Sequence, residues 1–340
     1  MAWFIHDGRP LHYLERGQGE PILLVHGLGS SGADWALQVR SLEKKYRVIV
    51  PDLPASGHSA PPEGGCSIEG LARALWALCD HLGARTVNLV GFSLGGAVSL
   101  EMALQRPQSV RRLGLINSLA SYRLDHWRKW LEAGLSLTLI PLLGMRRAAR
   151  LAARRLFPMP WQSALRERAA AVVGGVPFTS YLSTARALLA WTAIDRLHQI
   201  RSKVLVVAAE QDFTPLAEKR ELAAALGAHF IVVQGSRHGT PFDAVRATNA
   251  VLAAFVEDRP LPAAERCRCD GTAQRICFPG SLAQEHADSL AQAQAGPLAQ
   301  AQAGRLAEAQ AGRLAEAQAV SSAETAPAST GTPARTFLPV

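Results

Sequence analysis

The sequence predicts an α/β fold: a mostly parallel sheet flanked by helices, with a helical cap inserted between two strands and a disordered C-terminal tail. Three observations lead to this prediction. Short runs rich in Val, Ile and Leu alternate with helical patterns over most of the chain, and such alternation is typical of a parallel sheet. One long stretch in the middle holds helical patterns only, and the end of the chain is repetitive.

Six apolar runs are expected to form the buried strands. They are continuous rather than alternating, as expected for parallel strands covered on both faces. The runs lie at residues 21–27, 47–53, 86–92, 110–117, 203–211 and 229–235. Ahead of them, residues 3–7 and 11–17 resemble an antiparallel hairpin. Helices are predicted between the strands, for example at 67–82 with Ser67 as its N-cap, and at 94–106, where Pro107 stops the helix.

These patterns divide the chain into three parts. Residues 1–118 and 203–258 are predicted to form the core. Residues 119–202 lack the strand pattern and are predicted to form the cap, with breaks at Pro141, Pro158, Pro160 and Pro177. Residues 259–340 are predicted to be a low-complexity tail, whose eight-residue repeats begin at Leu290. Each repeat advances about 80° beyond two helical turns, so the leucines build no lasting stripe.

Composition limits the classes of protein that fit. Of the 340 residues 48% are hydrophobic, but no apolar run approaches the ~20 residues of a transmembrane segment. The N-terminus lacks the basic and apolar regions of a secretory signal. Five cysteines, only two of them before the tail, do not make a disulfide framework, so a reducing, cytoplasmic location is expected.

No cofactor, metal or nucleic-acid partner is expected. The sequence contains no phosphate-cradling loop and no nicotinamide fingerprint. Three tail cysteines, Cys267, Cys269 and Cys277, have a spacing that matches no zinc pattern.

The positive charge is concentrated in one segment. Residues 122–200 hold twelve Lys and Arg against four Asp and Glu, in a chain of net charge +8. Arg147, Arg150 and Arg154 fall on one helical face of this segment. A solvated lid helix is one interpretation. The other is a surface for an anionic partner: a carboxylate substrate, an acyl carrier protein or anionic lipid.

A serine between glycines, in Gly91-Phe-Ser93-Leu-Gly95, is the candidate nucleophile. The motif lies where a predicted strand meets a predicted helix, and this is the setting that a nucleophile turn requires. Glycines on both sides would remove Cβ clashes and leave the hydroxyl exposed above the sheet. An ordinary strand-to-helix turn is the alternative.

Ser93 needs a base and an acid to become nucleophilic. His238 follows the last predicted strand and Asp212 the one before it, so both belong to the same sheet edge as Ser93. His26 and His58 are the rival bases at this edge. Glu210 and Asp243 are the rival acids, and the strand ending near Asn117 offers none.

The order Ser93, Asp212, His238, each after its own strand, resembles the α/β-hydrolase fold family over residues 3–257. The stretches "VHGLGSSGADW" (25–35) and "PDLPASGHS" (51–59) also resemble loops of that family. The resemblance implies that the backbone N–H groups of Leu28 and Leu94 form an oxyanion hole.

The resemblance further implies a serine hydrolase without a cofactor, similar to small bacterial esterases and enol-lactonases. It would cleave a carboxylic ester or lactone through an acyl-enzyme on Ser93. A perhydrolase or acyltransferase and a carbon–carbon bond hydrolase are alternatives on the same residues. A non-catalytic binding protein that uses the basic cap is the alternative of another class.

Overall fold

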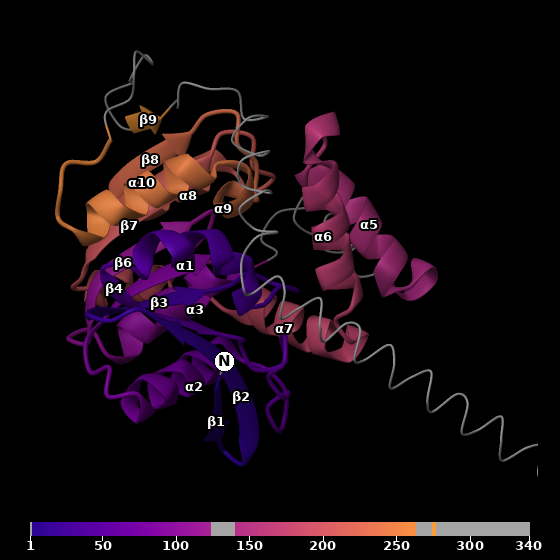
Figure 1. The fold of residues 1–340 in the computed structure, drawn as a ribbon, viewed down its shortest axis with the longest axis horizontal. Helices are drawn as coiled ribbons and strands as arrows, with labels where there is room; N and C mark the ends of the chain where they lie inside the picture. The colour runs from indigo at the N-terminus through magenta and orange to yellow at the C-terminus, as the bar shows by residue number, and fades with distance from the viewer. Residues whose placement is uncertain (1, 124–139, 263–273, 277–340) are drawn as a thin grey trace, which may run out of the picture. The chain divides into compact units, whose positions relative to one another are not determined.

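A single mixed sheet organises the computed structural model, which describes residues 2–123, 140–262 and 274–276. The strands lie in the order β1-β2-β4-β3-β5-β6-β7-β8-β9 (Figure 1). They span β1 (Ala2–His6), β2 (Arg9–Arg16), β3 (Glu20–Val25), β4 (Tyr46–Pro51), β5 (Val87–Phe92), β6 (Val110–Ile116), β7 (Lys203–Ala209), β8 (His229–Val233) and β9 (Gln274–Ile276). The predicted hairpin is confirmed, since β1 pairs antiparallel with β2 and β2 antiparallel with β4. Every other pairing is parallel.

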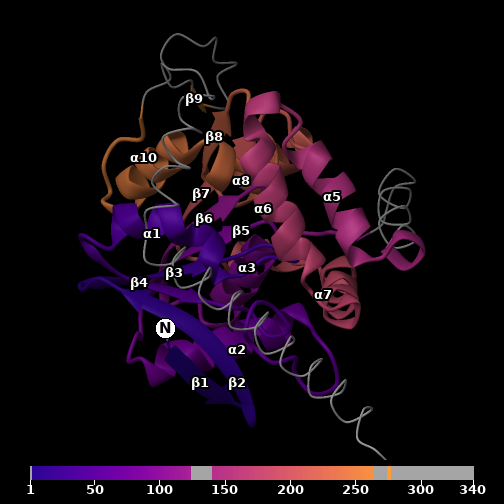
Figure 2. The ribbon, with the colours of Figure 1, turned by 45° about the vertical axis from the view of Figure 1, so that its right-hand side comes forward.

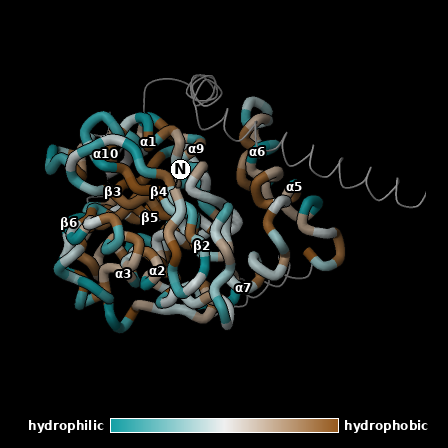
Figure 3. Tube along the Cα trace, turned by 60° about the horizontal axis from the view of Figure 1, so that its bottom comes forward, coloured by the Kyte–Doolittle hydropathy of each residue, from teal (hydrophilic) through white to brown (hydrophobic). Residues whose placement is uncertain are grey.

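Helices cover both faces of this sheet. The core helices are α1 (Ala36–Leu42), α2 (Ile68–His81), α3 (Leu94–Gln105), α8 (Leu216–Ala225), α9 (Thr240–Asp243) and α10 (Val245–Val256), with the 3-10 helix η1 (Gly32–Trp35) before α1. Side chains of α2, α3 and α8 share one apolar cluster with residues from β3 to β8. Helices α1 and α10 contact each other and cover the opposite face. Hydrophobic residues gather along the central strands β3, β4 and β5 (Figure 3).

Two predicted helix boundaries agree with the structure. The Ser67 hydroxyl accepts a hydrogen bond of 3.0 Å from the Gly70 amide, which caps α2 as predicted. Helix α3 ends at Gln105, two residues before Pro107, in agreement with the expectation that proline stops it.

The segment between β6 and β7 holds helices and no β-strand among its described residues. These helices are α5 (Met145–Leu156), α6 (Ser163–Gly174) and α7 (Phe178–Ala190), with the 3-10 helices η2 (Pro160–Gln162) and η3 (Ile194–Gln199). Helices α5 and α6 lie side by side (Figure 2), and Figure 1 shows them apart from the helices that flank the sheet. Pro158, Pro160 and Pro177 separate helices as predicted. Pro141 does not, because residues 140–143 are helical and the break falls at Gly144, whose φ is +74°.

The C-terminal part was predicted as a tail without structure, and β9 was not foreseen. This strand of three residues pairs parallel with β8. The eight-residue repeats and Cys267, Cys269 and Cys277 lie outside the described residues. Among the described helices, none has the length and apolar character needed to cross a bilayer.

Candidate active site

Ser93 occupies a strained position between β5 and α3. Its φ of 54° and ψ of −117° place it in a backbone region that residues with side chains rarely adopt. The neighbouring glycines explain how the turn is packed. A Cβ added at Gly91 would overlap the Gly95 carbonyl, and one added at Gly95 would overlap the Val25 carbonyl. The glycines are therefore required by close backbone approach, as the sequence predicted.

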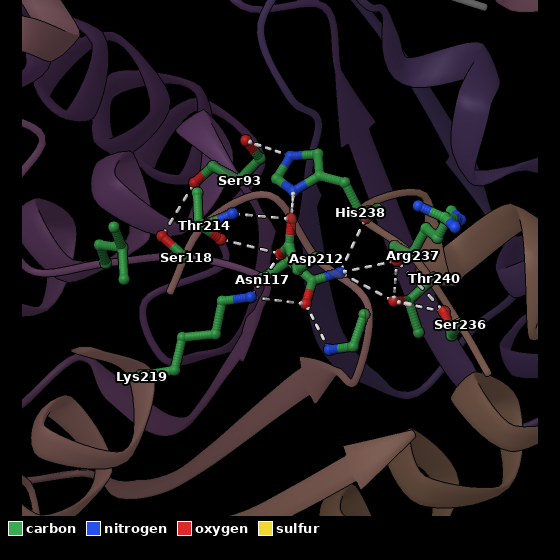
Figure 4. Close-up of polar contacts among 12 residues, drawn as sticks. Ser93, Asn117, Ser118, Asp212, Thr214, Lys219, Ser236, Arg237, His238 and Thr240 are labelled. Carbon is green, nitrogen blue, oxygen red and sulfur yellow. Dashed lines mark hydrogen bonds and ion pairs between the residues drawn. The ribbon is translucent and has the colours of Figure 1, made fainter. Parts of the chain in front are cut away.

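The structure brings Ser93, His238 and Asp212 together although they are far apart in sequence. His238 Nε2 lies 3.0 Å from Ser93 Oγ, and His238 Nδ1 lies 2.9 Å from Asp212 Oδ1 (Figure 4). An ionised carboxylate only accepts hydrogen bonds, so Nδ1 carries the proton and Nε2 is free to accept from the Ser93 hydroxyl. The side chains of His238 and Asp212 are 9% and 1% exposed, so this chain of hydrogen bonds is shielded from water.

Asp212 is held by three further donors. The Thr214 amide donates to Oδ1 over 3.2 Å and the Thr214 hydroxyl donates to Oδ2 over 2.8 Å. The ammonium group of Lys219 also pairs with Oδ2. Burial by itself would raise the pKa of Asp212, but the hydrogen bond from His238 and the positive charge of Lys219 outweigh it and hold the pKa well below its usual value. Asp212 is thus kept ionised.

Asn117 links the strand ends that carry these residues. Its φ is +48° and it follows β6 directly. Its Oδ1 accepts from the Ala209 amide at the end of β7 over 2.7 Å. Its Nδ2 donates to the His238 carbonyl over 2.8 Å and to the Thr240 hydroxyl over 2.7 Å. Asn117 therefore fixes the loop of His238 against the strand that precedes Asp212.

Ser118 and Tyr122 hold the backbone of Ser93 in place. The Ser118 hydroxyl donates to the Ser93 carbonyl over 2.9 Å, and Tyr122 OH lies 3.2 Å from the Ser118 oxygen. Since the Ser118 proton is already used, Tyr122 is the donor in this second bond. Burial raises the pKa of Tyr122 to about 12, so the phenol stays protonated and can donate.

The rival bases and acids make other contacts. His26 is buried, accepts from the Leu53 amide over 3.0 Å and contacts the Gly27 carbonyl at 2.8 Å, and burial lowers its pKa. The Nδ1 atom of His58 lies 3.1 Å from Asp52. Glu210 accepts from the Gly235 amide, and Asp243 accepts from Ser236 and Arg237.

One cluster of metal-binding residue types lies elsewhere in the described chain. His12, Asp52 and His58 each offer a ligand atom within 4.8 Å of the others. Both imidazoles instead contact the same carboxylate oxygen, at 2.9 and 3.1 Å. The other Asp52 oxygen accepts from the Gly32 amide over 2.7 Å. This network ties β2 to the loops after β3 and β4, which resemble the quoted family motifs.

Aromatic rings lie against the imidazole of His238. The rings of Phe92 and Phe213 lie with centroids 5.2 and 4.3 Å from the His238 ring. Phe157, at the end of α5, packs against Gly239, and Tyr181 of α7 packs against Gly29. The segment between β6 and β7 therefore contacts both the His238 loop and the loop of Leu28.

Lys219, Asn117 and Thr214 were missed by the sequence analysis. Asn117 was noted only as a strand end without an acid. Lys219 gave no signal, since a lysine in a helix is ordinarily exposed. The contact of Thr214 could have been predicted, because an Asp side chain in a turn often accepts a hydrogen bond from the backbone amide two residues further on.

Comparisons with known proteins show which family the chain belongs to. A putative carbamate hydrolase RutD from Caulobacter segnis is 30% identical over 248 residues, which cover 70% of this chain and 91% of the relative. The Magnesium-chelatase 30 kDa subunit of Rhodobacter capsulatus is 37% identical over 128 residues, but the match spans only 41% of that protein. The enol-lactonase from Burkholderia xenovorans LB400 superposes with a TM-score of 0.68 at 25% identity, covering 75% of this chain and 100% of that chain. The model of the alpha/beta hydrolase fold matches residues 20–245. The chain belongs to the α/β-hydrolase fold family.

Proposed function

We propose that this protein is a serine hydrolase that cleaves a carboxylic ester or lactone. Ser93 is the nucleophile, His238 the general base and then acid, and Asp212 the group that orients the imidazole. The observation that carries the proposal is the unbroken chain of hydrogen bonds from Ser93 Oγ through both ring nitrogens of His238 to Asp212. Family membership and the RutD and enol-lactonase relatives support hydrolysis as the general activity.

The first half of the reaction forms the acyl-enzyme. His238 Nε2 takes the hydroxyl proton while Ser93 Oγ bonds to the substrate carbonyl carbon, which becomes a tetrahedral oxyanion. The carbon–oxygen bond to the leaving group then breaks, and Nε2 returns its proton to that oxygen. In a lactone the leaving oxygen stays on the same molecule. Asp212 stabilises the charged imidazole throughout.

The second half uses water. Nε2 takes a proton from the water as its oxygen bonds to the acyl carbon, and the bond to Ser93 Oγ breaks with return of the proton to serine. An acyl acceptor such as an alcohol or peroxide would give the transferase or perhydrolase alternative by the same steps.

The amides of Leu28 and Leu94 are the proposed oxyanion donors. In the described part of the chain neither amide donates a hydrogen bond to another protein group. Leu94 is the first residue of α3, where amides lack partners within the helix. Close packing of Gly95 on the Val25 carbonyl supports placing this amide beside the loop that begins after β3. Two such donors would each stabilise the transition state by about 3 kcal/mol.

An anionic partner at the cap is a further part of the proposal. Arg146, Arg147, Arg150 and Arg154 are exposed on α5 and form no ion pair with another described residue. Their charge favours a carboxylate-bearing substrate or an acidic acyl carrier near the cap.

Labelling with a fluorophosphonate probe tests the central proposal. Wild type should be labelled at Ser93, and Ser93→Ala should abolish labelling and lower p-nitrophenyl acetate hydrolysis by about 10⁴-fold or more. Ser163→Ala, on α6, serves as the matched control. Labelling or turnover that survives Ser93→Ala would overturn the assignment. A purely binding protein would show neither in wild type, and added alcohol or peroxide separates transfer from hydrolysis.

A further inference from the structure

Lys219 is a buried, positively charged residue that forms an ion pair with Asp212, the candidate acid of the site. Its side chain is fully buried on α8, two turns from the end of the helix. Neighbouring positions on the same face are Leu222 and Ala223, which pack into the core. An apolar residue would satisfy this position by packing alone. Burying an ammonium group instead costs several kcal/mol unless its partners compensate.

The partners of Lys219 are specific. Its Nζ pairs with Asp212 Oδ2, and lies 3.4 Å from Asn117 Oδ1 (Figure 4). Asp212 Oδ1 is the atom that faces His238. Lys219 thus binds the carboxylate oxygen that does not contact the imidazole. Contacts to both oxygens fix the plane of the Asp212 carboxylate. Asn117 in turn holds the His238 carbonyl, so a single polar cluster positions both members of the acid–base pair.

The charge of Lys219 also acts through Asp212. A carboxylate alone favours the imidazolium form of its histidine partner, while a cation on the far side of the carboxylate opposes it. Burial lowers the pKa of Lys219 and Asp212 opposes that shift, as expected for an ion pair removed from water.

We propose that Lys219 is a positioning residue that orients Asp212 and restrains protonation of His238, so that the hydrolase stays active at lower pH than an Asp–His pair alone would allow. The inference rests on the proposed function. It assigns no contact between Lys219 and substrate.

The other charged or titratable groups near Lys219, Asp212 and His238 are the same in all the variants to be compared. Glu218 precedes Lys219 on α8, and Tyr122 follows β6. Arg237 and Asp243 flank the His238 loop, where the Arg237 amide donates to Asp243 over 3.1 Å. Ser93 itself contacts the ring. Because none of these is altered, a change in the pH profile reports on Lys219.

The test is the pH dependence of kcat/KM in Lys219→Met and Lys219→Gln, which keep most of the side-chain volume and remove the charge. We expect the acid limb of the profile to move to higher pH by about one unit, and the plateau to fall several-fold through poorer orientation of Asp212. Lys219→Arg, which restores the cation, should move the limb back towards wild type. Lys44→Met, an equal charge loss at an exposed site, should leave the limb in place.

A second measurement avoids dependence on activity. In a Ser93→Ala background, NMR titration of the His238 ring should show its midpoint raised when Lys219 is also replaced by Met or Gln. If both variants keep the wild-type acid limb and ring titration and only unfold more easily, Lys219 is structural and the inference is wrong. If Ser93→Ala retains activity, the proposed function fails instead, whatever the Lys219 variants do.

Discussion

Helices α3 and α5 have the same length, twelve residues, and differ in almost everything else. Eleven residues of α3 are buried, against two of α5, Ala149 and Ala153. Helix α6, also of twelve residues, buries none. Helix α3 follows Ser93 directly and is almost fully buried, whereas α5 presents arginines to solvent. The comparison teaches that the buried part of the fold fixes the positions of Ser93, Asp212 and His238, while most side chains of α5 and α6 are partly or fully exposed to solvent.

The treatment of charge shows the same difference. In the core, buried ionic groups are surrounded by donors and acceptors, as Asp212 and Asp52 are. On α5, Arg147, Arg150 and Arg154 project from the helix with no ion pair to another described residue. Buried charges need compensation to be tolerated at all, and exposed ones do not. Mutations of similar chemistry should therefore have very different effects in the two regions.

The largest difference in stability between a core variant and a cap variant is expected for glycine substitutions. Gly95→Ala places a Cβ against the Val25 carbonyl in the core, and we expect it to lower the free energy of unfolding by more than about 3 kcal/mol. Gly175→Ala is the matched change in the cap, at a position with φ of −88° where an added Cβ would lie 3.3 Å from the Ala171 carbonyl oxygen, so a shift of a few tenths of an ångström accommodates it. It should change stability by less than about 1 kcal/mol. Urea unfolding measures both, and equal effects would contradict the comparison.

A smaller, pH-dependent difference is expected for buried and exposed carboxylates. Burial would raise the pKa of Asp52, but hydrogen bonds from His12 and His58 outweigh it and hold the pKa far below its usual value. Asp52→Asn should lower the free energy of unfolding at pH 7 by about 2–4 kcal/mol, since it leaves buried partners unsatisfied. Glu167→Gln, on the exposed side of α6, should have almost no effect.

The sign of the pH dependence follows from the lowered pKa of Asp52. The ionised carboxylate contributes its full stability above its unfolded pKa of about 4, and this is lost as pH falls towards the folded value. The gap between wild type and Asp52→Asn should therefore narrow progressively below pH ~4 in urea titrations. A gap that stays constant from pH 7 to pH 3 would show that the charge of Asp52 is not what stabilises the loops.

Sequence was informative where the physics is local. Continuous apolar runs located the six central strands within two residues at their carboxyl ends, and these ends placed Ser93, Asp212 and His238 at one edge. Side-chain contacts between residues far apart in the sequence could not be predicted. The contact between Lys219 and Asn117 joins residues 102 positions apart, and no periodicity encodes such a pairing. Lys219 in particular breaks the rule that helical lysines face water, so only the packed structure shows its role.

The smallest effect on stability, and the sharpest test of the cap, is expected for its arginines. Replacing Arg147, Arg150 and Arg154 together by Ala should barely change unfolding, because these side chains pair with no described acid. If the cap receives an anionic partner, KM for a carboxylate-bearing ester should rise by about three- to ten-fold at low salt, with kcat nearly unchanged.

The control for this variant removes the same charge from the core. Arg9, Arg73 and Arg85 are exposed and form no ion pair with another described residue, so replacing all three by Ala matches the change in net charge. At ~0.15 M salt the screening length is about 8 Å. If the α5 arginines attract the carboxylate-bearing ester, KM for this ester should therefore rise from low to high salt in wild type. In the cap variant KM should not depend on salt in this way. KM for a neutral ester should be the same in both triple variants as in wild type. Identical salt profiles for the two triple variants would mean that α5 is a solvated helix and that its charge serves no partner.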